Sequence, residues 1–189
     1  MDPLARLFSS SARLKLLRLF LFNDDSSFPL DDIAFRTSVP VDSVRKELKV
    51  LIASGIIRKK TGATGVTYTA NRRFTHYVAL QTFLRTTTTL SDLDMLTALK
   101  KAGTLRLVAL SGLFSGAIET KVDLLVVGDK LDDKHLEKAV HQLESELGRE
   151  LRFAAFSTED FRYRVGVYDR LLRDIFDYPH RKILDKIGL

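Results

Sequence analysis

Apolar residues recur at helical spacing along the first half of the chain. An apolar residue at every third or fourth position favours an amphipathic helix. This pattern predicts helices over residues 9–22, 30–36, 41–54 and 72–85. Apolar segments at 56–60 and 66–70 flank the loop TGATG, which is typical of a β-hairpin. The first half is therefore predicted as three helices, a hairpin and a fourth helix.

Short apolar segments alternate with amphipathic ones in the second half. The pattern predicts strands at 105–110, 122–127 and 150–156. Helices are predicted at 91–101, 131–147, 158–164 and 167–177. Strands that alternate with helices imply an α/β sheet. We therefore expect an α+β protein of two domains, residues 1–89 and residues 90–189, the second an α/β domain with a small mixed sheet.

Composition narrows the classes of protein that fit. The 189 residues include no cysteine, which excludes disulfides, thiol chemistry and cysteine metal sites. The longest apolar run falls far short of the roughly 20 residues that a membrane span needs. The first residues also lack the layout of a signal peptide. We expect a cytoplasmic protein with no membrane partner.

Charge is unevenly distributed along the chain. The net charge is +6; residues 1–89 hold 14 Lys or Arg and 7 Asp or Glu, whereas residues 90–189 hold 16 and 17. The basic excess therefore lies in the first half. This asymmetry indicates a polyanion-binding module joined to a neutral one, with a merely solubilising surface as the alternative.

The third predicted helix has two distinct faces. At about 100° per residue, Val44, Leu48 and Leu51 fall on one face. The opposite face carries Asp42, Arg45, Lys46 and Lys49. One face can pack on the first two helices while the other meets a ligand, although a helix that is simply solvated has the same pattern.

The order of helices and hairpin resembles a winged helix-turn-helix domain over residues 9–85, most strongly in SVPVDSVRKELKVLIASGIIRKK. The resemblance implies a transcriptional regulator that binds double-stranded DNA as a homodimer reading two half-sites. The third helix would enter the major groove, and Ser43 near its start would favour a phosphate. The DNA-binding residues expected from this resemblance are Ser43, Arg45, Lys46, Lys49, Arg58, Lys59 and Lys60.

A segment of the second half resembles a catalytic signature in which key catalytic residues are replaced. Residues 112–127, GLFSGAIETKVDLLVV, are similar to the pattern G-S-x-A-R-G…S-D-I-D-L-L-V of the minimal nucleotidyltransferases of the DNA polymerase β superfamily. The resemblance implies a nucleotidyltransferase-like domain. It places a degenerate nucleotide site at Gly112, Gly116, Lys121 and Asp123.

Three positions depart from the nucleotidyltransferase pattern. Leu113 replaces the nucleotide-gripping Ser, Lys121 the first metal-binding Asp, and Arg152 the third carboxylate. We expect Lys121 and Asp123 on the same face of one strand. Because this chemistry needs divalent cations held by carboxylates, we expect no catalytic residue, metal or cofactor. Glu119 is the carboxylate that could substitute for a missing ligand.

Other polar groups have simpler interpretations. Ser91-Asp92-Leu93-Asp94 fits a capped helix start better than a metal site. The histidines at 76, 135, 141 and 180 show no metal-binding spacing. Arg162 and Arg164 could touch a phosphate but are expected to be solvated. The last predicted helix is expected to bury Leu171, Leu172, Ile175 and Phe176.

The favoured hypothesis is a DNA-binding regulator whose second domain serves dimerisation or ligand sensing. An active nucleotidyltransferase that modifies a protein or small molecule, and binds DNA to regulate itself, is the alternative. A third is a winged helix that binds protein, against which the basic helix face argues. The loop from Gly112 to Gly116 is expected either to be closed by Leu113 or to bind a nucleotide or phosphorylated ligand weakly.

Overall fold

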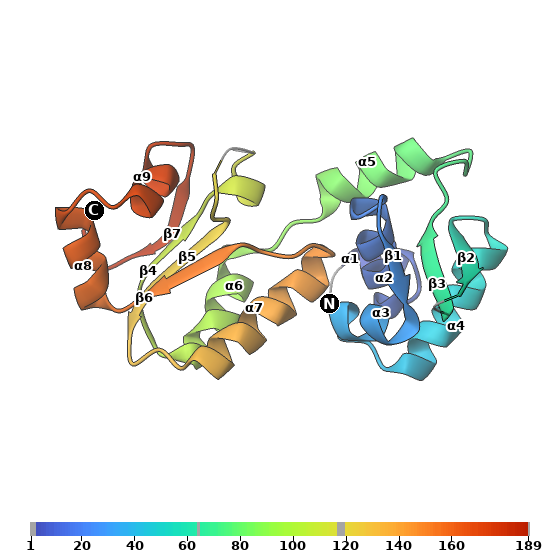
Figure 1. Cartoon of the computed structure of the whole chain (residues 1–189), viewed down its shortest axis with the longest axis horizontal. Coiled ribbons are helices and arrows are strands. Elements are labelled where there is room, and N and C mark those ends of the chain that lie inside the picture. The colour runs from blue at the N-terminus through green and yellow to red at the C-terminus, as the bar shows by residue number, and fades with distance from the viewer. Residues whose placement is uncertain (1–2, 64, 117–119, 189) are drawn as a thin grey trace. The chain divides into compact units, whose positions relative to one another are not determined.

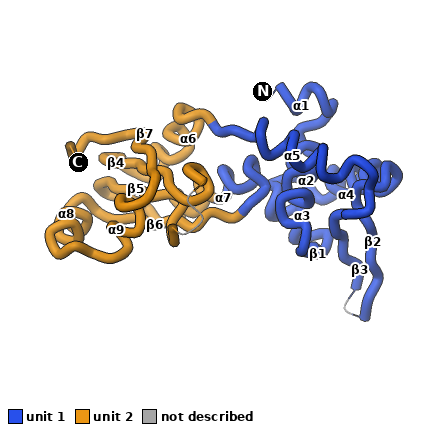
Figure 2. The backbone as a smooth tube through the Cα atoms, turned by 90° about the horizontal axis from the view of Figure 1, so that it is seen from above, with its two compact units in different colours: residues 1–90, 141–149 blue, residues 91–140, 150–189 orange. Residues whose placement is uncertain are grey.

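The computed structural model describes residues 3–63, 65–116 and 120–188. It forms two compact units, shown in different colours in Figure 2. The first unit comprises Met1–Leu90 and His141–Arg149, and the second comprises Ser91–Val140 and Glu150–Leu189. Each unit contains its own sheet together with helices, which confirms the expected α+β, two-domain fold class. Within the described residues, no helix combines the length and apolar character that crossing a membrane requires.

The first unit has the winged helix-turn-helix arrangement. Its elements, labelled in Figure 1, are α1 (Pro3–Leu7), α2 (Ser11–Phe22), β1 (Ser27–Pro29), α3 (Leu30–Thr37), α4 (Val41–Ala53), β2 (Ile57–Gly62), β3 (Gly65–Ala70) and α5 (Tyr77–Thr87). Strand β3 lies between β1 and β2 and runs antiparallel to both. The hairpin that follows α4 is the wing, and β1 adds a third strand to it.

Helix α2 is the centre of this unit. Ser10 caps it, since its Oγ accepts a hydrogen bond from the Arg13 amide at 3.1 Å. The expected stripe is buried, but so are residues on its other sides. The buried apolar residues of α2 are Leu14, Leu16, Leu17, Leu19, Phe20 and Leu21. A helix that is buried on several sides is typical of the interior of a core.

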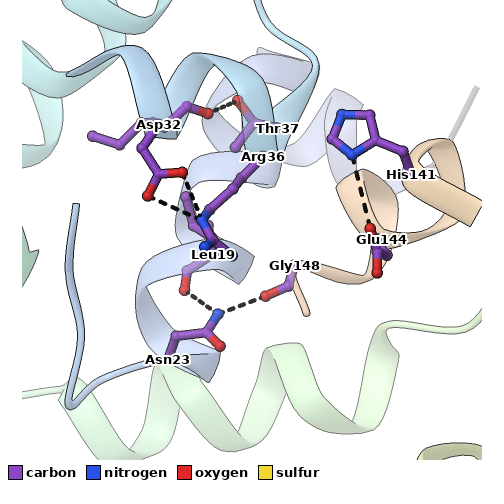
Figure 3. Close-up of polar contacts among 9 residues, drawn as sticks. Leu19, Asn23, Asp32, Arg36, Thr37, His141, Glu144 and Gly148 are labelled. Carbon is purple, nitrogen blue, oxygen red and sulfur yellow. Dashed lines mark hydrogen bonds and ion pairs between the residues drawn. The ribbon is translucent and has the colours of Figure 1, made fainter. Parts of the chain in front are cut away.

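The C-terminal end of helix α7 (Asp133–Leu147), with the two residues that follow it, belongs to the first unit. Asn23 donates hydrogen bonds from Nδ2 to the carbonyls of Leu19 (2.8 Å) and Gly148 (2.7 Å), as Figure 3 shows. Gly148 has a φ of +70°, and a Cβ there would lie 2.6 Å from the Arg18 carbonyl carbon. A larger residue is therefore excluded by both conformation and space.

The second unit is built on a mixed sheet. It contains α6 (Asp92–Leu99), η1 (Lys100–Ala102), β4 (Thr104–Leu110), η2 (Gly112–Phe114), β5 (Leu124–Asp129), the start of α7, β6 (Phe153–Phe156), α8 (Thr158–Gly166), α9 (Arg170–Phe176) and β7 (Arg181–Asp185). The strand order is β6-β5-β4-β7, with β5 and β6 parallel and the other pairs antiparallel. The expected small mixed sheet is confirmed.

The core of the second unit lies on both faces of its sheet. On one face, Phe161 of α8 and Leu172 and Ile175 of α9 pack against Leu107 and Leu125 of the central strands. Figure 1 shows α6 and α7 on the other side of the sheet. Leu172 and Ile175 are buried as expected, and Leu171 and Phe176 pack against the same cluster while half-buried.

Several elements differ from the sequence prediction. Helix α5 begins at Tyr77 rather than residue 72, because the preceding segment is a turn. There Asn71 donates to the Gly55 carbonyl (2.7 Å) and accepts from the Arg73 amide (3.3 Å). Strands β1 and β7 and helix α1 were not predicted. The first of these strands has only three residues and ends in proline, which is tolerated because the strand lies at the edge of the sheet.

Candidate nucleic-acid interface and degenerate nucleotide site

Helix α4 presents a basic face to solvent. Val44, Leu48 and Leu51 are buried, as their spacing predicts. On the opposite side Arg45, Lys46 and Lys49 are exposed, and Ser43 is partly buried at the helix start. Arg45 makes an ion pair with Asp42 at 3.0 Å, but both side chains are open to water. Such exposed pairs are worth little, so Arg45 can leave Asp42 for another anion at small cost.

Glu47 fixes the orientation of α4 against α2. Its carboxylate accepts hydrogen bonds from Ser10 Oγ at 2.6 Å and from Arg13 Nε at 2.8 Å. Arg13 also donates to the Phe8 carbonyl at 3.0 Å. These bonds tie the chain before α2 and the start of α2 to the middle of α4. This role of Glu47 was not predicted from the sequence. The signal for it was that Glu47 is the one acidic residue in the basic segment RKELK.

The wing carries three exposed cations that do not share one face. Arg58 and Lys60 lie opposite Thr69 and Thr67 in the register, whereas Lys59 lies opposite Tyr68. Because side chains alternate along a strand, Lys59 points to the other face of the hairpin. Strand β2 is also an edge of its sheet. Charged residues on an edge strand discourage pairing with other chains, which is the structural alternative to a binding role.

The site that the nucleotidyltransferase resemblance predicts is organised around Asp123. Its carboxylate is buried and accepts hydrogen bonds from the Leu113 amide (2.8 Å), the Arg152 amide (3.0 Å) and the Arg152 guanidinium. The guanidinium binds in a bidentate way, through NH2 to Oδ1 at 2.8 Å and through Nε to Oδ2 at 3.0 Å. The residue that replaces the third carboxylate is therefore the direct partner of the carboxylate that remains.

Gly112 allows this arrangement to close. It has a φ of +49°, and a Cβ there would overlap Asp123 Oδ1 and lie 2.8 Å from Thr120 Oγ1. Only glycine leaves room for the carboxylate to meet the loop. Gly116, further along the loop, is exposed and has no such neighbour. Gly112 thus has a packing role that is independent of any nucleotide.

Lys121 does not share a face with Asp123, so that expectation is wrong. Strand β5 begins only at Leu124, and the preceding residues do not follow the alternation of a strand. Lys121 is exposed while Asp123 is buried. The physical reason is that the Asp123 amide donates to the Arg152 carbonyl at 2.6 Å, which holds position 123 toward the interior. Glu119 lies outside the described residues.

Arg152 determines the charge state of the site. Burial raises the pKa of Asp123, but the hydrogen bonds from the Arg152 side chain and from the amides of Leu113 and Arg152 lower it, and the lowering is larger. The bond to Asp123 in turn raises the pKa of Arg152 despite its partial desolvation. Both groups are charged at neutral pH and neutralise each other.

The residues present do not fit the pair of divalent cations that the nucleotidyltransferase resemblance implies. Both oxygens of Asp123 already accept hydrogen bonds, and the other two carboxylate positions hold Lys121 and Arg152. Divalent cations of this kind require carboxylate oxygens that are free to coordinate. Across residues 3–63, 65–116 and 120–188, no group of three His, Asp or Glu could hold a metal ion.

The polar groups set aside in the sequence have structural partners. Ser91 caps α6 by accepting from the Asp94 amide at 3.1 Å, as expected. Arg162 is exposed, but Arg164 is not simply solvated. It pairs with Asp160 and Asp169, each at 3.0 Å, and lies over the ring of Phe156.

Comparison with known proteins assigns no family to the chain. No family model and no curated protein matches it. Among solved structures, reduced HlyU from Vibrio cholerae N16961 is similar to part of it, with 20% sequence identity and a TM-score of 0.36. The likeness covers 44% of this chain and 82% of that chain. Function therefore has to be inferred from the geometry of the chain itself.

Proposed function

We propose that the chain is a transcriptional regulator whose first unit binds double-stranded DNA. The supporting observation is the exposed cationic face of α4, formed by Arg45, Lys46 and Lys49, on a helix whose other face is buried. An α-helix fits the major groove, where Arg can donate two hydrogen bonds to guanine. Ser43, Arg58 and Lys60 then contact phosphates beside the groove, which favours binding without specifying sequence. Lys59, on the other face of the hairpin, adds only to the positive potential of the wing.

Substitutions on α4 test this proposal. The full chain first selects its preferred duplex from a random pool, and fluorescence anisotropy then measures affinity at several salt concentrations. Arg45→Ala weakens binding by about 1–3 kcal/mol if Arg45 contacts a base, and Lys49→Ala lowers the salt slope by about one if Lys49 contacts a phosphate. Lys138→Ala, an exposed cation of α7, is the matched control and leaves both unchanged. Wild-type affinity and slope in both α4 variants would rule out this interface.

We also propose that the regulator is a homodimer, joined through α5. The outward positions of this helix, Val78, Ala79, Thr82, Phe83 and Thr86, are exposed and uncharged, with Arg85 at their border. A second copy can meet such a face without the like-charge repulsion that the basic α4 surface would impose. Sedimentation equilibrium checks this: Phe83→Asp shifts the chain to monomer, whereas Lys138→Asp does not. A monomeric wild-type chain at all concentrations contradicts it.

The second unit is proposed to be a degenerate nucleotidyltransferase-like domain that no longer transfers nucleotides. Support comes from Asp123, whose oxygens are occupied by Arg152 and Leu113. The Leu113 amide, which could otherwise bind a phosphate, already donates to Asp123. This favours a closed loop over a weak site for a nucleotide or phosphorylated ligand. The alternative of an active transferase predicts magnesium- or manganese-dependent pyrophosphate release that is lost in Asp123→Ala. We expect none.

A further inference from the structure

A groove in the second unit is lined by none of the residues of the Asp123 site. It runs between the end of α8, helix α9 and the start of β7, and has a volume of about 360 Å³. Val165, Tyr168, Leu172 and Phe176 form its apolar wall, and none of them belongs to the cluster around Asp123. Pockets for small molecules have volumes of this order and mostly apolar walls.

The wall of the groove is held in place by the fold. Asp169 caps α9 by accepting from the amides of Leu171 (2.8 Å) and Leu172 (3.3 Å), and it pairs with Arg164. Phe176 packs edge-on against Phe161, with ring centroids 6.4 Å apart. A binding surface that is already ordered loses little conformational entropy when a ligand arrives.

Tyr168 is the unusual residue of this groove. Its side chain is among the most exposed aromatic groups, at 81%, although it lines an apolar surface. Its backbone has a φ of +55°, a conformation that costs free energy for any residue with a side chain. Because the Tyr168 ring is exposed, it does not stabilise the packed core and does not compensate for the backbone strain. The backbone conformation does place the ring at the mouth of the groove, where a ligand could stack on it.

The charged side chains at the rim are already paired within the protein. Arg173 bonds Asp177 at 3.3 Å and Lys182 bonds Asp185 at 3.0 Å. The charged lining of the groove consists of two acids and two bases, so it favours neither an anionic nor a cationic ligand over an uncharged one. His180 Nδ1 lies 2.9 Å from the Tyr178 carbonyl oxygen. With the proton on Nδ1, its Nε2 is an acceptor for a hydroxyl or amide of a ligand.

We propose that this groove binds an uncharged, largely aromatic small molecule that carries one hydrogen-bond donor. The aromatic part packs against Tyr168, Phe176 and Leu172, and the donor faces His180. Binding depends only on the geometry of the second unit, so it is independent of whether the first unit binds DNA. It gives the second unit a ligand-sensing role at a place distinct from the degenerate nucleotide site.

The test uses the full chain and Nile red, a neutral aromatic dye whose emission rises in apolar surroundings. Nile red has no hydrogen-bond donor, so it reports on the aromatic part of the site, and a phenol used as competitor supplies the donor. We expect saturable binding of one dye per chain, displaced by an uncharged substituted phenol. The anionic dye anilinonaphthalene sulfonate is the comparison and binds more weakly. Tyr168→Ala lowers the Nile red affinity by about tenfold, the effect of losing one aromatic stacking contact. Tyr163→Ala removes another exposed tyrosine, at 69%, which belongs to α8 and does not line the groove, and leaves the affinity unchanged.

A second variant separates binding from folding. Val165→Trp fills the groove from a residue that is already 38% exposed, so it leaves the thermal unfolding midpoint unchanged while abolishing dye binding. The proposal is overturned by absence of saturable dye binding, by equal losses in Tyr168→Ala and Tyr163→Ala, or by tighter binding of the anionic dye. It is also overturned if Tyr168→Ala changes the oligomeric state, which would make the groove an interface between copies.

Discussion

At the scale of single residues, the partners of Asp123 decide what its carboxylate can bind. A buried carboxylate needs a positive partner. A metal ion can bind and leave, whereas the Arg152 guanidinium is part of the chain and stays at 2.8 Å. The pair therefore stabilises the loop–strand junction and occupies both carboxylate oxygens of Asp123. The sequence singled out Arg152 as standing where the resemblance expects a carboxylate. Its bond to Asp123 could not be predicted, because this bond depends on how β5 and β6 are paired.

Arg152→Met should destabilise the second unit by about 1–3 kcal/mol at pH 7, since Asp123 loses charged hydrogen bonds while keeping its amide donors. Because Arg152 holds the pKa of Asp123 below its ordinary value, the stabilisation is present above about pH 4 and is lost as pH falls through the folded-state pKa. The difference between variant and wild type should therefore shrink at pH 3. Urea unfolding at both pH values measures it, with the exposed Arg162→Met as control. An equal difference at both pH values contradicts the pairing.

Tyr77 predicts a second pH dependence, at the alkaline end. Burial, followed by the hydrogen bond that it donates to Asp24 Oδ2 at 3.0 Å, raises the pKa of Tyr77 to about 12. A raised pKa means that the stabilisation is complete below about pH 10, the ordinary value for tyrosine, and disappears as pH rises toward 12. As the pH rises from about 9.5 to about 11.5, the free energy of unfolding should fall less in Tyr77→Phe than in wild type, because phenylalanine has no hydroxyl to ionise. The exposed Tyr163→Phe is expected to behave like wild type.

At the scale of elements, strong periodicity was the reliable guide. Helix α4 runs over Val41–Ala53 with the predicted faces, because three buried apolar residues at helical spacing leave little choice of orientation. Strands β1 and β7 were missed, since one is three residues long and the other is largely exposed and charged. Their place in a sheet comes from partners that are distant in sequence, which no local pattern encodes.

Leu48→Asp should unfold the first unit, because Leu48 is 2% exposed at the centre of the packed face and an unpaired buried carboxylate costs several kcal/mol. The neighbouring Lys49→Asp carries the same new charge on the exposed face and should remain folded. Circular dichroism with urea unfolding distinguishes them. Similar stability of the two variants means that the helix faces the other way.

At the scale of the whole molecule, the sequence pattern predicted two domains, and the basic excess lies in the first half of the chain. Neither observation could show that each unit draws on distant parts of the chain. Residues 141–149 lie far along the sequence, yet Lys15 bonds Ser145 at 3.2 Å and Arg18 bonds the Glu146 carbonyl at 3.0 Å. Nothing in the periodicity of α7 distinguishes the half that packs in one unit from the half that packs in the other.

This sharing matters for anyone who wishes to excise the first unit. A fragment ending at residue 90 keeps every proposed DNA contact but loses the segment that covers Arg18 and Asn23. Arg18 is 3% exposed in the intact chain, so the cut uncovers both its charge and the apolar side chains beside it on α2. We expect such a fragment to self-associate and melt early. Grafting residues 141–149 back through a flexible linker should restore a soluble fragment.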